Sequence, residues 1–140
     1  MIEHRIFYKG ALVVTRASGV VKHQALIDHV FWLIDSRNIG ELRDGFSQLI
    51  YVEDIDSMEL TEQDIYRISE ISNNMGRTRG RFRTAIVAVE PYDYKLAQVH
   101  KTLAPQADIE VELFDDFDAA FDWLGLKNPD PATIRLRRPA

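Results

Sequence analysis

Ala85-Ile86-Val87-Ala88-Val89 is a run of five apolar residues built from β-branched and small side chains. A continuous apolar run of this length is typical of a strand that is buried on both faces, as strands of parallel sheets are. We therefore expect it to lie at the centre of a parallel sheet. Pro91 follows two residues later and fits the first turn of a helix, which ends before Pro105. A buried strand followed by a helix predicts an α/β domain.

The segments on the amino-terminal side alternate in the same way. Thr61 with Asp64 three residues later has the pattern of a capping box, which predicts a helix that Gly76 ends. Residues 53–57 are predicted to form a turn, and Lys9-Gly10 is predicted to join a β-hairpin whose second strand ends at Ser18-Gly19. The expected elements are strands over 5–8 and 11–17, a helix over 22–37, a strand over 46–52 and a helix over 61–75.

The carboxyl-terminal side continues the alternation. Residues 109–114 alternate apolar and acidic side chains, which predicts a strand at the edge of the sheet with one wet face. Asp115 or Asp116 is expected to cap a last helix that Gly125 closes. Residues 127–140 carry basic side chains and three prolines and are predicted to form a tail after a domain over 1–126. The order is ββαβαβαβα, with a mostly parallel five-stranded sheet, an N-terminal hairpin and four helices.

Composition limits the class of protein. The chain has 140 residues, of which 46% are hydrophobic and 28% charged, and it suits one globular domain. It has no cysteine, so disulfides and thiol chemistry are excluded. The longest unbroken apolar runs, 30–34 and 85–89, have five residues each, far short of the roughly 18 residues that a membrane span needs. With no signal-like amino terminus, the sequence predicts a cytoplasmic protein.

The predicted order resembles the STAS fold of anti-sigma factor antagonists, and three stretches carry the resemblance. The ending VELFDDFDAAFDWLG, residues 111–125, is similar to the last strand and helix of the small bacterial STAS-like group, also called SpoIIAA-like or STAS/SEC14-type. Residues 14–19 and 83–88 resemble its second and fourth strands. The resemblance covers about residues 1–126. It implies a non-enzymatic regulatory module that docks a protein, as a homodimer, or else a carrier of a small apolar ligand or lipid.

The turn after the third strand is the first candidate site. In the antagonists this turn carries an Asp-Ser-Ser/Thr-Gly motif whose serine is phosphorylated, whereas this chain has Asp56-Ser57-Met58-Glu59. Asp54, Asp56 and Ser57 would follow a parallel strand and precede a helix, where α/β folds place ligands. The alternative is a simple turn whose acidic residues complement the helix dipole.

Residues 76–83 form the second candidate site, a docking loop of four arginines with one aromatic. Arginines of this kind bind phosphate groups or an acidic partner while the aromatic ring stacks. The net charge of −5 argues against nucleic acid as that partner. The alternative is a solvated loop whose arginines pair with the acidic body. The residues are Arg77, Arg79, Arg81, Phe82 and Arg83.

Two tyrosines form the third candidate site. Tyr92 and Tyr94 follow the apolar strand and are expected either to line the rim of a pocket or to pack on the sheet. The four histidines are dispersed, so no metal and no cofactor is predicted. Because common catalytic motifs are missing from the sequence, no enzyme is predicted either. For the carrier alternative, the broad apolar helix over 26–34 would form one wall of a cavity.

Overall fold

A computed structural model of the chain describes residues 1–75, 81–126 and 134. Its elements alternate as the sequence predicts, and the fold class is confirmed. The strands and helices are β1 (Ile2–Phe7), β2 (Leu12–Lys22), α1 (His23–Asn38), β3 (Ser47–Glu59), α2 (Glu62–Asn74), β4 (Phe82–Val87), α4 (Pro91–Leu103), β5 (Ile109–Phe114) and α5 (Phe117–Leu124). Short 3-10 turns, η1 (Tyr8–Gly10) and η2 (Ala104–Ala107), join β1 to β2 and α4 to β5.

The five strands lie side by side in chain order. β1 is antiparallel to β2, and the pairs from β2 to β5 are parallel. β3 therefore occupies the centre and β5 an edge. The edge position predicted for 109–114 is confirmed, whereas the central position predicted for 85–89 is wrong, because β4 lies one strand away from the middle.

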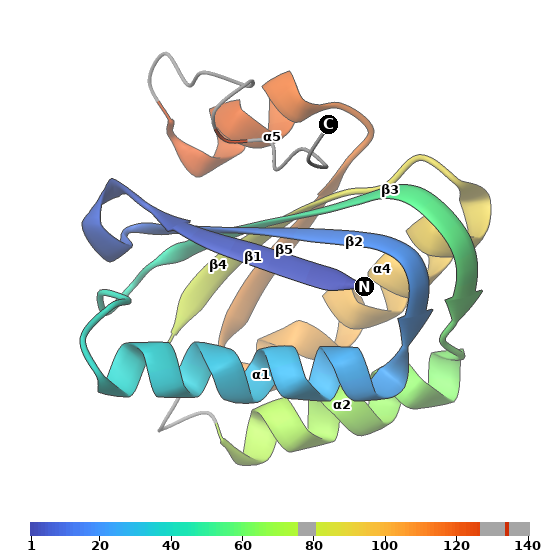
Figure 1. Cartoon of the computed structure of the whole chain (residues 1–140), viewed down its shortest axis with the longest axis horizontal. Helices are drawn as coiled ribbons and strands as arrows, with labels where there is room; N and C mark the ends of the chain where they lie inside the picture. The colour runs from blue at the N-terminus through green and yellow to red at the C-terminus, as the bar shows by residue number, and fades with distance from the viewer. Residues whose placement is uncertain (76–80, 127–133, 135–140) are drawn as a thin grey trace.

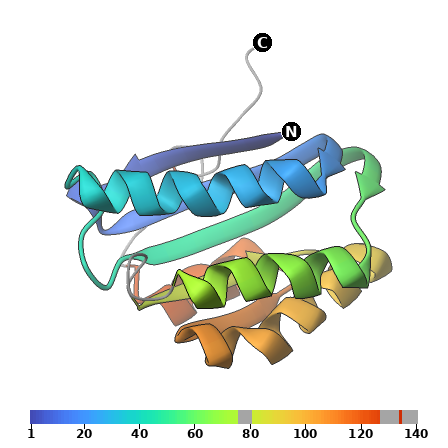
Figure 2. The same ribbon diagram turned by 90° about the horizontal axis from the view of Figure 1, so that it is seen from below.

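The strand order decides which face each helix covers. Parallel strands that follow one another in chain order are joined by right-handed crossovers, which put every connecting helix on the same face. Helices α1, α2 and α4 accordingly lie together below the sheet, as Figures 1 and 2 show. Helix α5 connects no strands and, of the helices named above, is the one that lies on the other face.

The face that carries α5 is closed by apolar side chains of the same chain. Phe121 and Leu124 of α5 pack on Leu49 of β3 and Val87 of β4, and Ile134 is buried against the same group. Ile134 is the one described residue of the predicted tail; the others lie outside the described residues. Helix α5 of the same chain therefore covers this face of the sheet.

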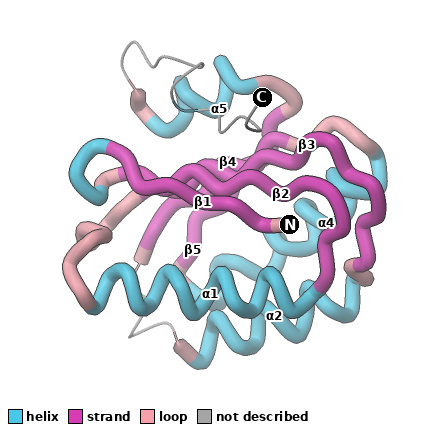
Figure 3. The backbone as a smooth tube through the Cα atoms, in the orientation of Figure 1, coloured by secondary structure: helices cyan, strands magenta, loops and turns pink. Residues whose placement is uncertain are grey.

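Strands β2 and β3 are longer than predicted and bend together at one end, which Figure 3 shows. The register shifts on both sides of Gly19, where β3 contains extra residues opposite β2. Gly19 and Asp54 both have positive φ, +65° and 52°. Such conformations favour glycine and, less strongly, aspartate, and they bend a strand at a bulge without ending it. The predicted strand end at Ser18-Gly19 is therefore wrong.

Helix ends follow the sequence closely. Thr61 accepts a hydrogen bond from the backbone of Asp64 and donates its own backbone N–H to that carboxylate, so the capping box is confirmed. Asp116 caps α5 and Gly125 ends it in the left-handed conformation. The predicted stop at Gly76 lies outside the described residues. Among the described residues, no helix is long and apolar enough to cross a membrane.

Candidate functional site

A cavity of about 150 Å³ lies between the sheet and helices α1, α2 and α4. Its walls are mainly apolar and include Leu26, Val30 and Leu33 from α1, Ile68 from α2 and Leu96 from α4. The volume is close to that of the ~150 Å³ apolar cavity known to bind benzene or xenon. The space therefore suits one small ring or a short aliphatic group and is too small for a two-chain lipid.

A row of polar side chains crosses the sheet beside this cavity, one from each of the three central strands. Gln48 of β3 lines the cavity and connects the row. Its Oε1 accepts from Thr15 of β2 at 3.4 Å, and its Nε2 donates to Thr84 of β4 at 3.2 Å. All three residues are at least 97% buried. Buried amides without partners cost free energy, so this network fixes the orientation of the Gln48 side chain.

His29 of α1 completes the network from the helix side. Its Nε2 lies 2.6 Å from Oε1 of Gln48. Because that oxygen only accepts, the Nε2 nitrogen carries the proton, and Nδ1 is the unprotonated acceptor. Burial lowers the pKa of His29 to about 4, so the ring is neutral at neutral pH. Its Nδ1 is buried and has no hydrogen-bond partner among the described residues.

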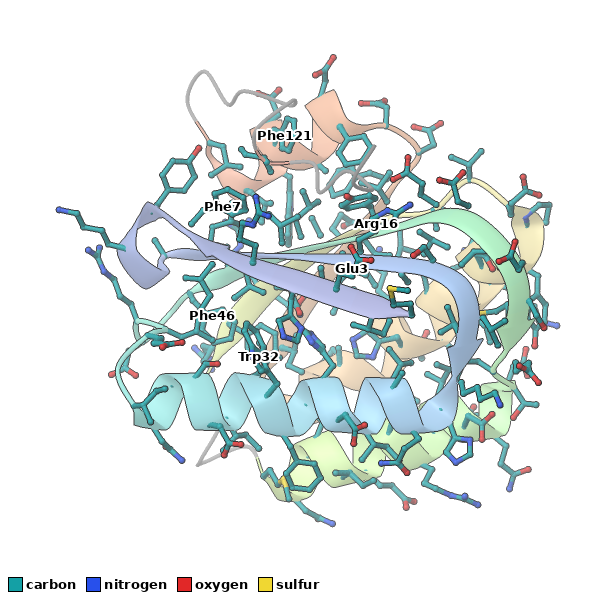
Figure 4. All side chains as sticks on the ribbon, in the orientation of Figure 1. Glu3, Phe7, Arg16, Trp32, Phe46 and Phe121 are labelled. Carbon is teal, nitrogen blue, oxygen red and sulfur yellow. The ribbon has the colours of Figure 1, made fainter. Side chains whose placement is uncertain are left out.

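The imidazole ring of His29 lies beside a stack of two other rings. His4 of β1 stacks on Trp32 of α1 with 3.5 Å between ring centroids, and Trp32 lies nearly parallel to His29 at 5.9 Å. In Figure 4 Trp32 lies between α1 and the sheet. Burial lowers the pKa of His4 as well. The stack therefore keeps two neutral imidazoles next to the polar row.

Asp93 contributes a carboxyl group to the cavity from the first turn of α4. It is 8% exposed, and burial together with the nearby charge of Glu90 raises its pKa. Neither Lys nor Arg is among the described residues that line the cavity. An anionic ligand would therefore meet the Asp93 carboxyl group with neither a Lys nor an Arg of the described lining beside it.

The opposite face of the sheet has a different polar feature, centred on Arg16 of β2. Its guanidinium donates to Glu53 at 3.0 Å, to Asp54 at 3.1 Å and to Ser18 at 3.1 Å. Glu3 of β1 lies 3.8 Å away, and Figure 4 shows both residues on the side of the sheet that carries α5. The Arg16 side chain is 2% exposed. Its N–H groups donate to residues of the same chain, so a structural role explains why Arg16 is buried.

The predicted turn site is wrong in its local structure. Asp54, Asp56 and Ser57 lie within β3, where Ser57 pairs with Val20, and not in a turn between strand and helix. Asp54 is bonded to Arg16. The bulge at Asp54 explains the error, since bulged strands carry the same acidic and small residues that turns do.

The predicted docking loop is only partly within the described residues. Arg77 and Arg79 lie outside them. Phe82 is 4% exposed and stacks on Phe46 with centroids 4.6 Å apart, so its predicted role as an exposed stacking group is wrong. Arg81 pairs with Asp108, and Arg83 pairs with Glu110 and lies 4.1 Å from the ring of Trp123. These contacts favour pairing with the acidic body.

The two tyrosines do not line the cavity. Tyr92 donates its hydroxyl to the backbone oxygen of Leu60 and holds α4 against the end of β3. Tyr94 is half-buried on the same helix. The residue between them, Asp93, is the one that reaches the cavity. Sequence reasoning missed it, together with Gln48, Thr84 and His29. A weak signal existed for Gln48 and Thr84, since each is a polar residue within an otherwise apolar strand.

Comparisons with known proteins bear on the fold. No family model matches the chain, and no curated protein matches it. An uncharacterised protein of the DUF3478 family from Shewanella loihica PV-4, described as SpoIIAA-like in fold, matches with a TM-score of 0.58 and 20% identity over 88% of this chain and 93% of that one. The anti-sigma factor antagonist SpoIIAA in its unphosphorylated form matches with a TM-score of 0.52 and 13% identity over 89% of this chain and 98% of that one. The chain therefore has the SpoIIAA-like (STAS) fold.

Proposed function

We infer that this chain is a binding module without a catalytic step that holds a small apolar ligand between its sheet and helices α1, α2 and α4. The observation that carries this proposal is the cavity of about 150 Å³, whose mainly apolar wall includes the hydrogen-bonded side chains of His29 and Gln48. Ligand sites in proteins are mostly apolar concave spaces with a few well-placed polar groups, and this arrangement has both properties.

The alternative, docking of a protein by a homodimer, has less support. Helix α5 covers the second face of the sheet, and the described arginines of the predicted docking loop pair within the chain. The homodimer and the protein partner stay predictions. The carrier proposal is accordingly preferred, with the ligand limited to about the size of one ring by the cavity volume.

Toluene tests the proposal, because it matches the expected size and carries no polar group. At ten times its dissociation constant, a ligand of the native state adds about 1.4 kcal/mol of stability. For a domain of this length, that shifts Tm by about 3–6 °C. We expect this shift, together with backbone amide shifts in NMR spectra confined to residues around the cavity.

A cavity-filling variant is the matched test. Ala97 of α4 lines the cavity and is buried, so Ala97→Leu places three more carbon atoms in the space. We expect it to fold and to lose the response to toluene. Ala119→Leu, at an exposed position of α5, should respond as the wild type does. A toluene response that survives unchanged in Ala97→Leu, or no response in the wild type, would refute the proposal.

A further inference from the structure

The outer edge of β1 carries backbone groups that no described strand pairs. β1 is the first strand in the sheet order, and in Figures 1 and 2 no described helix or strand lies beyond it. The backbone oxygen of Met1 accepts from the N–H of Ser18 at 2.9 Å. Backbone groups alternate in direction along an antiparallel strand, so the odd-numbered residues of β1 also point towards β2. The N–H and C=O groups of Ile2, His4 and Ile6 therefore point outward.

The charged side chains of β1 are complementary to those of a second β1 in one register. A copy related by a twofold axis perpendicular to the sheet runs antiparallel to β1 and keeps the same face on the same side. With the axis at His4, the outward-pointing residues face one another, and Glu3 of each copy lies opposite Arg5 of the other. Side chains approach closest at such non-hydrogen-bonded positions. Moving the axis to Glu3 or to Arg5 would put like charges opposite, which destabilises pairing.

Both charged side chains are available for this contact. Arg5 is exposed and forms no hydrogen bond or ion pair with the described residues. Glu3 has 36% of its side chain exposed and lies 3.8 Å from Arg16, so its carboxylate can accept from a second guanidinium. His4 would face its own copy across the axis, and burial lowers its pKa. The two imidazoles would therefore be neutral at neutral pH and would not repel each other.

The other edge strand, β5, does not favour the same contact. Its charged residues are Glu110 and Glu112, which point to the same face because they are two residues apart. A twofold axis at Val111 would put them opposite each other, and an axis at either one would put it opposite its own copy. Both are already paired within the chain, with Arg83 and Lys101. Acidic side chains on an edge strand oppose edge-to-edge pairing, and β1 lacks this protection.

We propose that the outer edge of β1 docks a second copy of this chain, with the two β1 strands antiparallel about His4 and a Glu3–Arg5 ion pair on each side of the axis. The contact joins two five-stranded sheets into one. β1 has six residues and is about 20 Å long, so the interface is small and the dimer dissociates on dilution. The proposed function does not enter this inference, because the cavity lies between the sheet and its helices and not at this edge.

Analytical ultracentrifugation of the wild type and two variants tests the interface. Arg5→Glu puts a second carboxylate opposite Glu3 in both ion pairs, and because Arg5 is exposed the variant should fold. Arg67→Glu makes the same change in net charge at an exposed position of α2. We expect the wild type and Arg67→Glu to dimerise reversibly as concentration rises. The dissociation constant of Arg5→Glu should be higher by about 10-fold or more. A wild type that stays monomeric at the concentration of an NMR sample, or equal constants for the two variants, would overturn the proposal.

Amide hydrogen exchange identifies the register in the wild type and so does not depend on the folding of a variant. The N–H groups of His4 and Ile6 point outward, so their exchange should slow as the protein concentration rises. The N–H groups of Glu3 and Arg5 point towards β2 in the monomer and should change less. No slowing at His4 and Ile6 in a dimeric sample would place the interface elsewhere and overturn the proposal.

Discussion

The two faces of the sheet are covered in different ways. On the α5 face, one short helix and Ile134 bury Leu12, Leu49 and Val87, and the buried guanidinium of Arg16 donates to Glu53 and Asp54 of the same chain. On the other face, three helices leave a cavity, and Nδ1 of His29 has no hydrogen-bond partner among the residues that the structure describes. One face is therefore closely packed, whereas the other retains a cavity and a buried acceptor, Nδ1 of His29, that no described residue bonds.

The largest expected effect concerns the pH dependence of the cavity face. The folded pKa of His29, about 4, lies below the ordinary value of 6.5, so its contribution to stability is present above pH 6.5 and is lost as the pH falls towards 4. The full difference amounts to about 3 kcal/mol. Urea unfolding at pH 7 and pH 4 should show that His29→Gln loses less stability than the wild type by about this amount.

His4 provides the control for that measurement. Its pKa is also lowered by burial, so His29→Gln should retain a smaller loss of stability in acid. His23 is exposed, so His23→Gln serves as the control for replacing a histidine at the surface. Equal pH dependence in the wild type and His29→Gln would mean that His29 is not buried in its neutral form.

The next effect tests whether the ion network stabilises the α5 face. Arg16→Met keeps much of the side-chain volume but leaves Glu53 and Asp54 without their cation. Removing one partner of a buried pair costs about 3–5 kcal/mol. We expect about 2 kcal/mol here, because both carboxylates reach solvent, with 22% and 60% of their side chains exposed. Chemical denaturation of the variant and the wild type measures the difference.

Arg81→Met is the matched control, since Arg81 and its partner Asp108 are both largely exposed. The free energy of unfolding of this variant should stay within about 0.5 kcal/mol of the wild type. If Arg16→Met also changed the free energy of unfolding by less than about 0.5 kcal/mol, the Arg16 network would contribute no more than a surface ion pair. The polar difference between the two faces would then be wrong.

The smallest expected difference is one of packing, and it is measured by making the same substitution once on each face. Ala120 of α5 is fully buried in the closed face, whereas Ala97 of α4 borders the cavity. Ala120→Leu should destabilise the chain by about 1–3 kcal/mol, because overpacking displaces neighbouring side chains. Ala97→Leu should change stability by less than about 1 kcal/mol. Thermal unfolding of both variants measures this, and equal losses would indicate that the cavity face is as tightly packed as the other.

Local signals in the sequence predicted most of the fold. The capping box at Thr61, the cap at Asp116 and the stop at Gly125 depend on neighbouring residues only, and all three are confirmed. The prediction failed where pairing between distant segments decides the structure. The bend at Gly19 is a bulge because β3 continues opposite it, and no local pattern distinguishes such a bulge from a strand end.

The candidate site was much less accessible to prediction than the fold. Gln48, Thr84 and Thr15 come from three strands, and only the order and register of the parallel pairs bring them into one row. Likewise, Phe82 is an aromatic residue beside an arginine-rich segment in the sequence, but its position in β4 places its ring against that of Phe46. Residue type alone therefore led to the wrong prediction for Phe82.

The sequence by itself determined the α/β class, the alternation of strands and helices and the ends of several helices, because these depend on residue periodicity and local hydrogen bonds. Only the tertiary structure decided that the connecting helices share one face, that α5 closes the other and that His29 meets Gln48 beside a cavity. The physical reason is that a cavity and its polar atoms arise from side chains far apart in the chain, whose positions follow from strand order and crossover handedness.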